Sequence, residues 1–140
     1  MQARVVWSGR GMRFEGRAQD KPWVAIHIPE KSEEPQGSTP MELLFLGALA
    51  CTASDVADIL RKGRSKLEAI TVDGEAERAT KDPRVFTRIH ITYRIRGTVQ
   101  EKAARRAVML SQERYCSATI TLRRAGAEIR SDVHIEPPRG

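Results

Sequence analysis

Hydrophobic and polar residues alternate along two stretches in the middle of the chain, as in β-strands with one buried face. The stretches cover residues 69–80 and 85–96, and the turn sequence KDPR separates them. They therefore predict a long antiparallel hairpin with one solvated face. In the second stretch, we expect Val85, Thr87, Ile89, Ile91, Tyr93 and Ile95 to point inward. We expect Phe86, Arg88, His90, Thr92, Arg94 and Arg96 to point outward.

The flanking segments predict the other elements. Residues 4–18 have β-rich ends around a Gly-Arg-Gly turn and predict a hairpin, and residues 22–28 add a short strand. Further along, the pattern predicts an amphipathic helix over 99–114, a short helix over 116–122 and a last strand over 127–135. With the central helix described next, the order is βββ-α-ββ-α-(α)-β, an α+β fold in a single domain over residues 1–140.

The stretch STPMELLFLGALACTASDVADIL predicts the central helix. Thr39 is the expected N-cap, Pro40 takes the first helical position, and Glu42 completes a capping box. Residues 43–53 are apolar on every side, which is typical of a core helix enclosed by other elements. The helix is expected to end at Gly63 in the left-handed conformation. Because about six strands cover such a helix poorly, we expect an obligate dimer.

Charged residues argue against a membrane span. The apolar part of the central helix includes Glu42 and is soon followed by Asp55 and Asp58. The N-terminal sequence lacks the long apolar core of a secretory signal. We therefore expect a cytoplasmic protein without a membrane partner.

The net charge of +6 would suit a nucleic-acid binder only if the basic residues were clustered. Here they are interleaved with acidic residues, and two Trp, two Tyr and three Phe offer few stacking platforms. The pattern favours a solvated basic surface, and no nucleic-acid partner is expected.

Cys51 and Cys116 are the two cysteines of the chain. They form no CxxC motif, and His27, His90 and His134 fall on separate predicted strands. We therefore expect no metal and no cofactor. In a reducing compartment, the two thiols are either inert or redox-active.

The residues alone leave both interpretations open. Cys51 lies about twelve residues into its helix, too far for the dipole to stabilise a thiolate, and an apolar shell with Asp55 one turn later would raise its pKa. Cys116 precedes the short helix 116–122, whose N-terminal N–H groups would favour a thiolate, although a packed cysteine fits equally well. Sequence spacing does not show whether the sulfurs meet.

The sequences TPMELLFLGALACTASDV and, some 65 residues later, ERYCSATITL resemble the OsmC/Ohr family of osmotically inducible and organic-hydroperoxide-resistance proteins. The resemblance covers nearly the whole chain. It implies an intertwined homodimer in which two central apolar helices are enclosed by antiparallel sheets. It also implies an antioxidant role in a stress response.

The chemistry that the resemblance implies is that of a two-cysteine peroxidase. Cys51 would reduce an organic hydroperoxide and become a sulfenic acid, and Cys116 would condense with it to form a disulfide. An external dithiol, lipoyl-type or thioredoxin-like, would reduce that disulfide.

The resemblance further implies an arginine from the first hairpin and a glutamate directly after the helix-opening proline. Arg10 matches the arginine, with Arg13 as second choice, but Met41 holds the place of the glutamate. Glu42 lies nine residues before Cys51, about 180° around the helix from it, so we expect it to be a capping residue. This departure indicates a less characterised branch. An alternative function is a dimeric module that binds a small apolar ligand or senses redox state.

Overall fold

The computed structural model describes residues 1–140, and the chain forms two compact units, residues 1–46 and 47–140. One helix, α1 (Pro40–Lys62), begins in the first unit and ends in the second. Each unit is described separately below. The expectation of a single domain stays a prediction.

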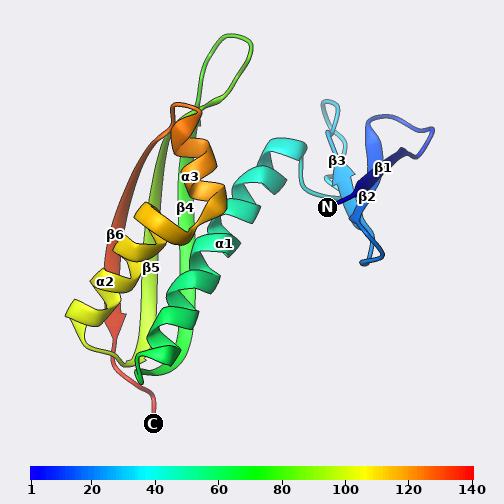
Figure 1. Cartoon of the computed structure of the whole chain (residues 1–140). Helices are drawn as coiled ribbons and strands as arrows, with labels where there is room; N and C mark the ends of the chain where they lie inside the picture. Colours follow the sequence, from blue (N-terminus) through cyan, green and yellow to red (C-terminus); the bar gives the residue numbers. More distant parts are fainter. The chain divides into compact units, whose positions relative to one another are not determined.

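The first unit is an antiparallel sheet of three strands in the order β1-β2-β3 (Figure 1). The strands are β1 (Ala3–Trp7), β2 (Arg13–Ala18) and β3 (Val24–His27). In the turn between β1 and β2, Gly9 and Gly11 have positive φ angles, and the Trp7 indole N–H donates a hydrogen bond of 2.8 Å to the Gly11 carbonyl. The predicted hairpin with its Gly-Arg-Gly turn is thereby confirmed.

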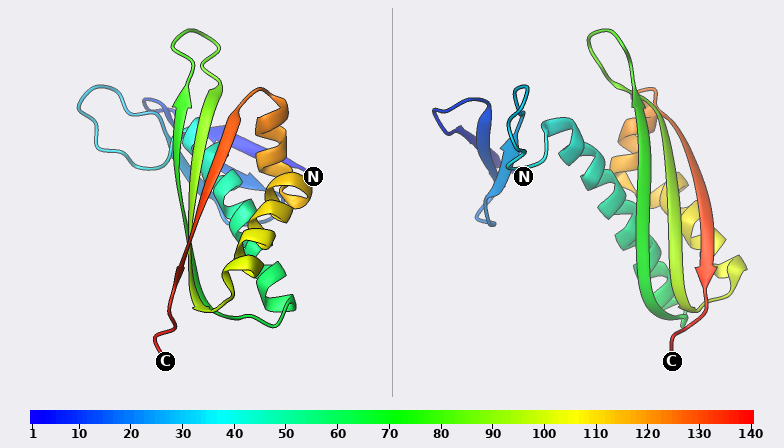
Figure 2. Two further views of the ribbon diagram at one scale, coloured as in Figure 1. Left: turned by 90° about the vertical axis from the view of Figure 1, so that its left-hand side faces the viewer. Right: turned by 180° about the vertical axis from the view of Figure 1, so that it is seen from behind.

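The second unit places three helices on one face of a second sheet (Figure 2). The sheet has the order β4-β5-β6, with β4 (Lys66–Arg78), β5 (Phe86–Thr98) and β6 (Glu128–Glu136). The helices are the second half of α1, α2 (Glu101–Leu110) and α3 (Ser117–Arg124). The β4–β5 hairpin is antiparallel, as the alternating pattern predicts.

The last strand corrects the expectation of purely antiparallel sheets. β6 pairs with β5 in parallel, so the second sheet is mixed. After β5 the chain crosses one face of the sheet through α2 and α3, and such a crossover returns the next strand in the same direction. Alternation within a strand does not reveal this direction.

The inward positions of β5 are confirmed for Ile89, Ile91, Tyr93 and Ile95, which are buried. At the start of the strand the expectation is wrong, because Phe86 is 8% exposed while Val85 is 45% exposed. Glu77 pairs with Arg88 but Arg78 pairs with Phe86, so Thr87 is an extra residue in the ladder. One extra residue turns the preceding side chains to the opposite face.

The start of α1 is a reciprocal capping box, as predicted. The Thr39 N–H donates to Glu42 Oε1 at 2.8 Å, and the Glu42 N–H donates to Thr39 Oγ1 at 3.3 Å. The backbone of Thr39 thereby lowers the pKa of the Glu42 carboxyl.

Within a single chain, α1 is buried along one stripe rather than on every side. Ala48, Thr52, Val56 and Leu60 recur every fourth residue and are buried. By length and composition alone α1 is long and apolar enough to cross a membrane, so on that criterion Glu42, Asp55 and Asp58 do not exclude a span, contrary to expectation. The buried stripe and the side-chain hydrogen bonds described below give α1 protein partners.

The C-terminal end of α1 differs from the expectation that Gly63 takes the left-handed conformation. Arg64, not Gly63, has the left-handed conformation, with φ of 66°. The Ser65 N–H donates to the Leu60 carbonyl at 3.0 Å, and the Arg64 N–H donates to the Arg61 carbonyl at 3.2 Å. These are the two bonds of a Schellman motif, with a non-glycine residue in its strained position.

Replacing Arg64 with glycine is therefore expected to stabilise the fold by about 1 kcal/mol, because glycine adopts positive φ without steric cost. The control is Arg61→Gly in the last helical turn, which should destabilise by a similar amount. Urea unfolding at one fixed protein concentration measures both. A lower midpoint for Arg64→Gly would show that the arginine side chain outweighs the backbone strain.

Candidate active site

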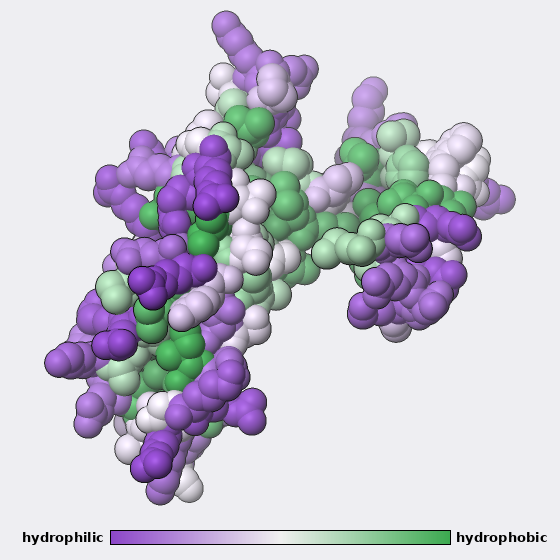
Figure 3. Space-filling model, viewed as in Figure 1, coloured by the Kyte–Doolittle hydropathy of each residue, from purple (hydrophilic) through white to green (hydrophobic).

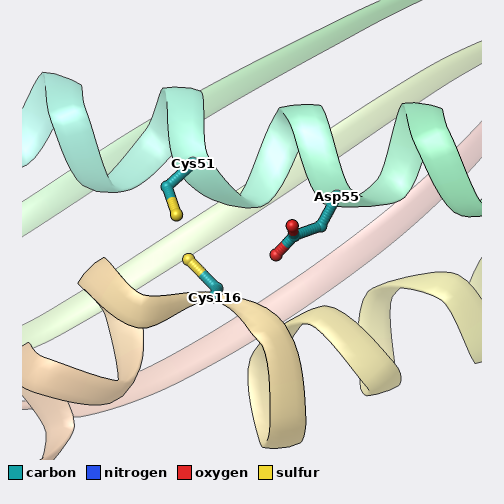
Figure 4. Close-up of side chains that lie close together, drawn as sticks. All are labelled: Cys51, Asp55 and Cys116. Carbon is teal, nitrogen blue, oxygen red and sulfur yellow. The ribbon is translucent and has the colours of Figure 1, made fainter.

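Cys51 lies in the middle of α1, in the second unit, and is partly exposed. Asp55 follows it by four residues and is also partly exposed. Residues four apart in a helix lie on the same face, so the thiol and the carboxylate project in a similar direction. Here that direction is toward the segment that joins α2 to α3 (Figure 4).

Cys116 lies in that segment. A π-helical turn, Ser111–Tyr115, follows α2, and the Cys116 N–H closes it by donating to the Ser111 carbonyl at 2.8 Å. Cys116 is then the N-cap of α3, where its Sγ accepts a hydrogen bond of 3.4 Å from the Thr119 N–H. π-Turns are rare and frequent at functional sites. The predicted short helix is confirmed, with Cys116 fully buried at its start.

The fold brings the two cysteines together although 65 residues separate them in sequence. Cys51 Sγ, Cys116 Sγ and a carboxylate oxygen of Asp55 all lie within 4.8 Å of one another. Figure 4 shows the two sulfur atoms pointing toward each other, with the Asp55 carboxylate beside them. The question that sequence spacing leaves open, whether the thiols meet, is thereby answered.

Burial dominates the acidity of Cys116. It raises the pKa of this thiol, and the neighbouring Cys51 raises it further, while the hydrogen bonds to Thr119 act in the opposite direction. The N-terminal N–H groups of α3 do favour the thiolate, as expected, but desolvation outweighs them. Cys116 is therefore a thiol at neutral pH.

A buried polar network lies beside the cysteine pair, and Thr52 is at its centre. The Thr52 hydroxyl is 2.7 Å from the Tyr93 hydroxyl and 2.8 Å from the Ser111 hydroxyl. Ser111 in turn donates to Asp55 Oδ2 at 3.0 Å. Burial raises the pKa of Tyr93, so its hydroxyl remains a neutral donor and acceptor.

Gln112 and Arg123 complete the network. Gln112 Nε2 donates to the Tyr93 hydroxyl at 2.7 Å, and Arg123 holds Gln112 by donating to its backbone carbonyl at 2.7 Å and to its Oε1 at 3.0 Å. Apart from the inward position of Tyr93, the sequence pattern did not predict this network. The sequence did carry one signal for it. Thr52 and Tyr93 are polar residues at positions where the helical and strand patterns require buried side chains.

Arg10 and Arg13 belong to the first unit. Arg10 is exposed in the β1–β2 turn, where its backbone N–H donates to the Ser8 hydroxyl at 3.2 Å. Arg13 opens β2 and lies 3.8 Å from Glu33. The structure describes the cysteine pair in the other unit, so the part that either arginine takes in thiol chemistry stays a prediction.

Glu42 is the capping residue that the helical geometry indicates. Because its carboxyl pKa is lowered in the folded state, its charge stabilises the protein above the ordinary carboxyl range, and this contribution is lost as pH falls through the folded pKa. Glu42→Gln should keep the hydrogen bonds, remove the charge and cost about 0.3–0.5 kcal/mol near neutral pH, since the exposed carboxylate is screened.

Urea midpoints of Glu42→Gln and the wild-type chain, compared from pH 3 to pH 7, measure this effect; the two should converge at the acid end. A difference that persists there would mean that the carboxylate charge is not its source. Thr39→Ala serves as the control that removes the cap, at a cost of about 1 kcal/mol.

Comparison with known proteins agrees with this fold. Residues 32–132 match the family model described as OsmC-like protein, and the chain therefore belongs to the OsmC-like family. Among its relatives, Protein YhfA of Escherichia coli strain K12 is 35% identical over 126 residues, which cover 89% of this chain and 91% of YhfA. The family resemblance seen in the two cysteine motifs is confirmed.

Solved structures show the same α+β fold. The crystal structure of a hypothetical protein from Aquifex aeolicus VF5 matches with a TM-score of 0.80 at 28% identity, covering 96% of each chain. The organic hydroperoxide resistance protein OsmC from Legionella pneumophila matches with a TM-score of 0.72 at 17% identity, covering 95% of each chain. At 17% identity, the similarity to the Legionella pneumophila protein shows a shared fold and nothing more.

Proposed function

We propose that this protein is a two-cysteine peroxidase that reduces organic hydroperoxides. The observation that supports this most directly is the meeting of Cys51 and Cys116, whose sulfur atoms lie within 4.8 Å. A disulfide requires a sulfur–sulfur distance of about 2.05 Å, so modest side-chain and backbone adjustments would close the bond. Membership of a family with members named for organic hydroperoxide resistance supports the choice of oxidant.

Exposure supports the division of roles between the cysteines. Cys51 is partly exposed and is the thiol that a peroxide meets first, whereas Cys116 is fully buried behind it. Cys51 is therefore the proposed peroxidatic residue and Cys116 the proposed resolving residue.

In the first step, the Cys51 thiolate attacks a peroxide oxygen, the O–O bond breaks, and the alcohol leaves after taking up a proton. Cys51 is oxidised to a sulfenic acid. The Cys116 thiol then attacks the Cys51 sulfur, the S–S bond forms, and the sulfenic hydroxyl leaves with the Cys116 proton as water. An external dithiol, lipoyl-type or thioredoxin-like, restores both thiols by exchange and becomes a disulfide itself.

The surface of the first unit supports a homodimer. Several large apolar side chains of this unit are exposed in the single chain: Val5, Val6, Trp7, Trp23, Val24, Leu44 and Leu46. Figure 3 shows apolar surface over the β1–β2–β3 sheet and over the start of α1. Exposed apolar surface of this kind marks association sites. The dimer and a cytoplasmic location, where thiols stay reduced, are parts of the proposal.

The test counts free thiols before and after one equivalent of cumene hydroperoxide. The reduced chain should lose both thiols and gain an intramolecular Cys51–Cys116 disulfide, identified by peptide mass. Two unchanged thiols would overturn the peroxidase assignment and favour the alternative, a dimeric module that binds a small apolar ligand.

Arg10 is proposed to stabilise the Cys51 thiolate, with Arg13 as second choice. Arg10→Ala should slow the reaction of Cys51 with hydroperoxide by about 100-fold, the usual effect of losing one preorganised charge-stabilising donor. Single-turnover stopped-flow measurements test this, with Arg4→Ala on the exposed β1 strand as the matched control. A larger loss for Arg13→Ala than for Arg10→Ala would transfer the role to Arg13.

A further inference from the structure

Three side chains of types that can ligate a metal ion converge at the cysteine site. Cys51 and Asp55 project from one face of α1, and Cys116 faces them from the start of α3 (Figure 4). The two sulfur atoms and one Asp55 oxygen lie within 4.8 Å of one another. Histidine spacing and CxxC motifs, on which the expectation of no metal rests, do not reveal donors that only the fold brings together.

The distances suit a tetrahedral ion. Zn²⁺ binds thiolates at about 2.3 Å and carboxylates at about 2.0–2.2 Å, which places neighbouring donors roughly 3.5–3.8 Å apart. The three donor atoms lie within 4.8 Å of one another, about 1 Å beyond the separation that such a shell requires at most. Two thiolates select a thiophilic ion over Mg²⁺ or Ca²⁺, which prefer oxygen ligands.

The surroundings orient two of the donors. Ser111 donates a hydrogen bond to Asp55 Oδ2, and Ser111 is itself fixed by Thr52. The Thr119 N–H donates to Cys116 Sγ. Hydrogen bonds to the ligands themselves are a regular feature of metal sites, where they fix ligand orientation.

The Asp55 carboxylate also bears on the charge of the site. Asp55 is partly buried beside two thiols, yet it takes part in none of the ion pairs formed by residues 1–140. Arg123, a basic residue of α3, donates its hydrogen bonds to Gln112. Within the second unit, residues 47–140, this carboxylate has no ion-pair partner, and a bound cation would supply a positive charge beside it.

We infer that Cys51, Asp55 and Cys116, in their reduced state, form a Zn²⁺ site with a fourth position for water. Binding displaces the two thiol protons. Formation of the Cys51–Cys116 disulfide removes both thiolate ligands, so the metal-bound and oxidised states exclude each other. With a hydroperoxide as two-electron oxidant, two thiolates and two protons yield the disulfide, the alcohol and water, and Zn²⁺ is released.

Metal binding by the reduced thiols does not depend on the proposed peroxidase activity, whereas release by hydroperoxide rests on it. Two oxidants distinguish loss of the metal on thiol oxidation in general from loss caused by reaction with a hydroperoxide. Diamide oxidises neighbouring thiols directly, and cumene hydroperoxide requires peroxide chemistry at Cys51. A chromophoric chelator measures the Zn²⁺ that each one releases.

The first measurement is a Co²⁺ titration of the reduced chain, because Co²⁺ reports its ligands by absorption. The expected result is a thiolate-to-cobalt charge-transfer band with the visible bands of tetrahedral Co²⁺, saturating at one ion per chain and lost on addition of Zn²⁺. Cys51→Ser and Cys116→Ser should each weaken the band. Absence of the band, with both thiols free, would overturn the inference.

Asp55→Asn tests the third ligand and should lower Co²⁺ affinity at least about tenfold. The matched control is Asp58→Asn, an exposed residue on α1 that pairs with Lys62, and it should bind as the wild-type chain does. Equal affinity of Asp55→Asn and wild type would overturn the three-ligand site. If Asp55→Asn does not fold, the diamide experiment decides: Zn²⁺ retained by the disulfide form contradicts the inference.

If diamide releases Zn²⁺ and cumene hydroperoxide does not, the metal site stands, and the thiol count on the metal-free reduced chain decides the peroxidase proposal. If both release it at the rate of disulfide formation, both proposals are supported.

Discussion

Cys51→Ser is expected to reduce hydroperoxide consumption to the level of the uncatalysed reaction, a loss of at least about 1,000-fold, because a serine hydroxyl is neither acidic nor nucleophilic enough to replace a thiolate. The measurement follows loss of cumene hydroperoxide in the presence of an excess of a dithiol. Thermal unfolding of the variant should match that of the wild type, since the substitution removes no buried apolar group.

Cys116→Ser should behave differently. Cys51 would still reduce one equivalent of hydroperoxide per chain, but no resolving thiol would follow, so the sulfenic acid should persist and react with dimedone. Mass spectrometry detects this adduct on the peptide that contains Cys51. Equal turnover of Cys116→Ser and wild type would show that the external reductant acts on the sulfenic acid directly, and the two-cysteine scheme would then be wrong.

The largest stability effect is expected for Thr52→Val. Its hydroxyl is fully buried and hydrogen-bonds to Tyr93 and Ser111, and it also accepts from Gln112 at 3.3 Å. Valine keeps the shape but leaves these groups without a common partner, at a cost of about 2 kcal/mol. Thr52→Ser is the matched control, because it keeps the hydroxyl and loses one methyl group, at a cost of about 0.8 kcal/mol.

Urea unfolding of both variants, at one protein concentration, measures the difference. If Thr52→Val proved no less stable than Thr52→Ser, the network would contribute through packing rather than through hydrogen bonding. The comparison is informative because burial of a polar network does not by itself guarantee a net gain in stability.

The local features of the fold could be predicted from the sequence because each depends on neighbouring residues. Thr39, Pro40 and Glu42 specify a helix start through contacts within four positions, and the structure contains those contacts. The inward series from Ile89 to Ile95 follows from strand periodicity alone. The parallel direction of β6 depends instead on how a long crossover packs, which no local pattern encodes.

The two cysteines of the candidate site stand out in the sequence, but their geometry could not be predicted from it. The cysteines could be selected by motif, but their approach depends on the π-turn at Ser111–Tyr115 and on the packing of α1, which involve long-range contacts. The hydrogen-bond partners of Asp55 and Thr52 were missed for the same reason. The choice of Arg64 rather than Gly63 as the left-handed residue was missed because glycine is the usual occupant.

The extra residue Thr87 has a consequence for the chemistry. A second irregularity, between Leu67 and Ala69, lies at the other end of β4, and between the two the hairpin pairs residue for residue. Sliding one strand by a single step would require both irregularities to move and would rotate Tyr93 out to solvent. The two irregularities therefore fix the register of β5 against β4 at both ends of the hairpin. That register keeps the Tyr93 hydroxyl in contact with Thr52 on the helix that carries Cys51.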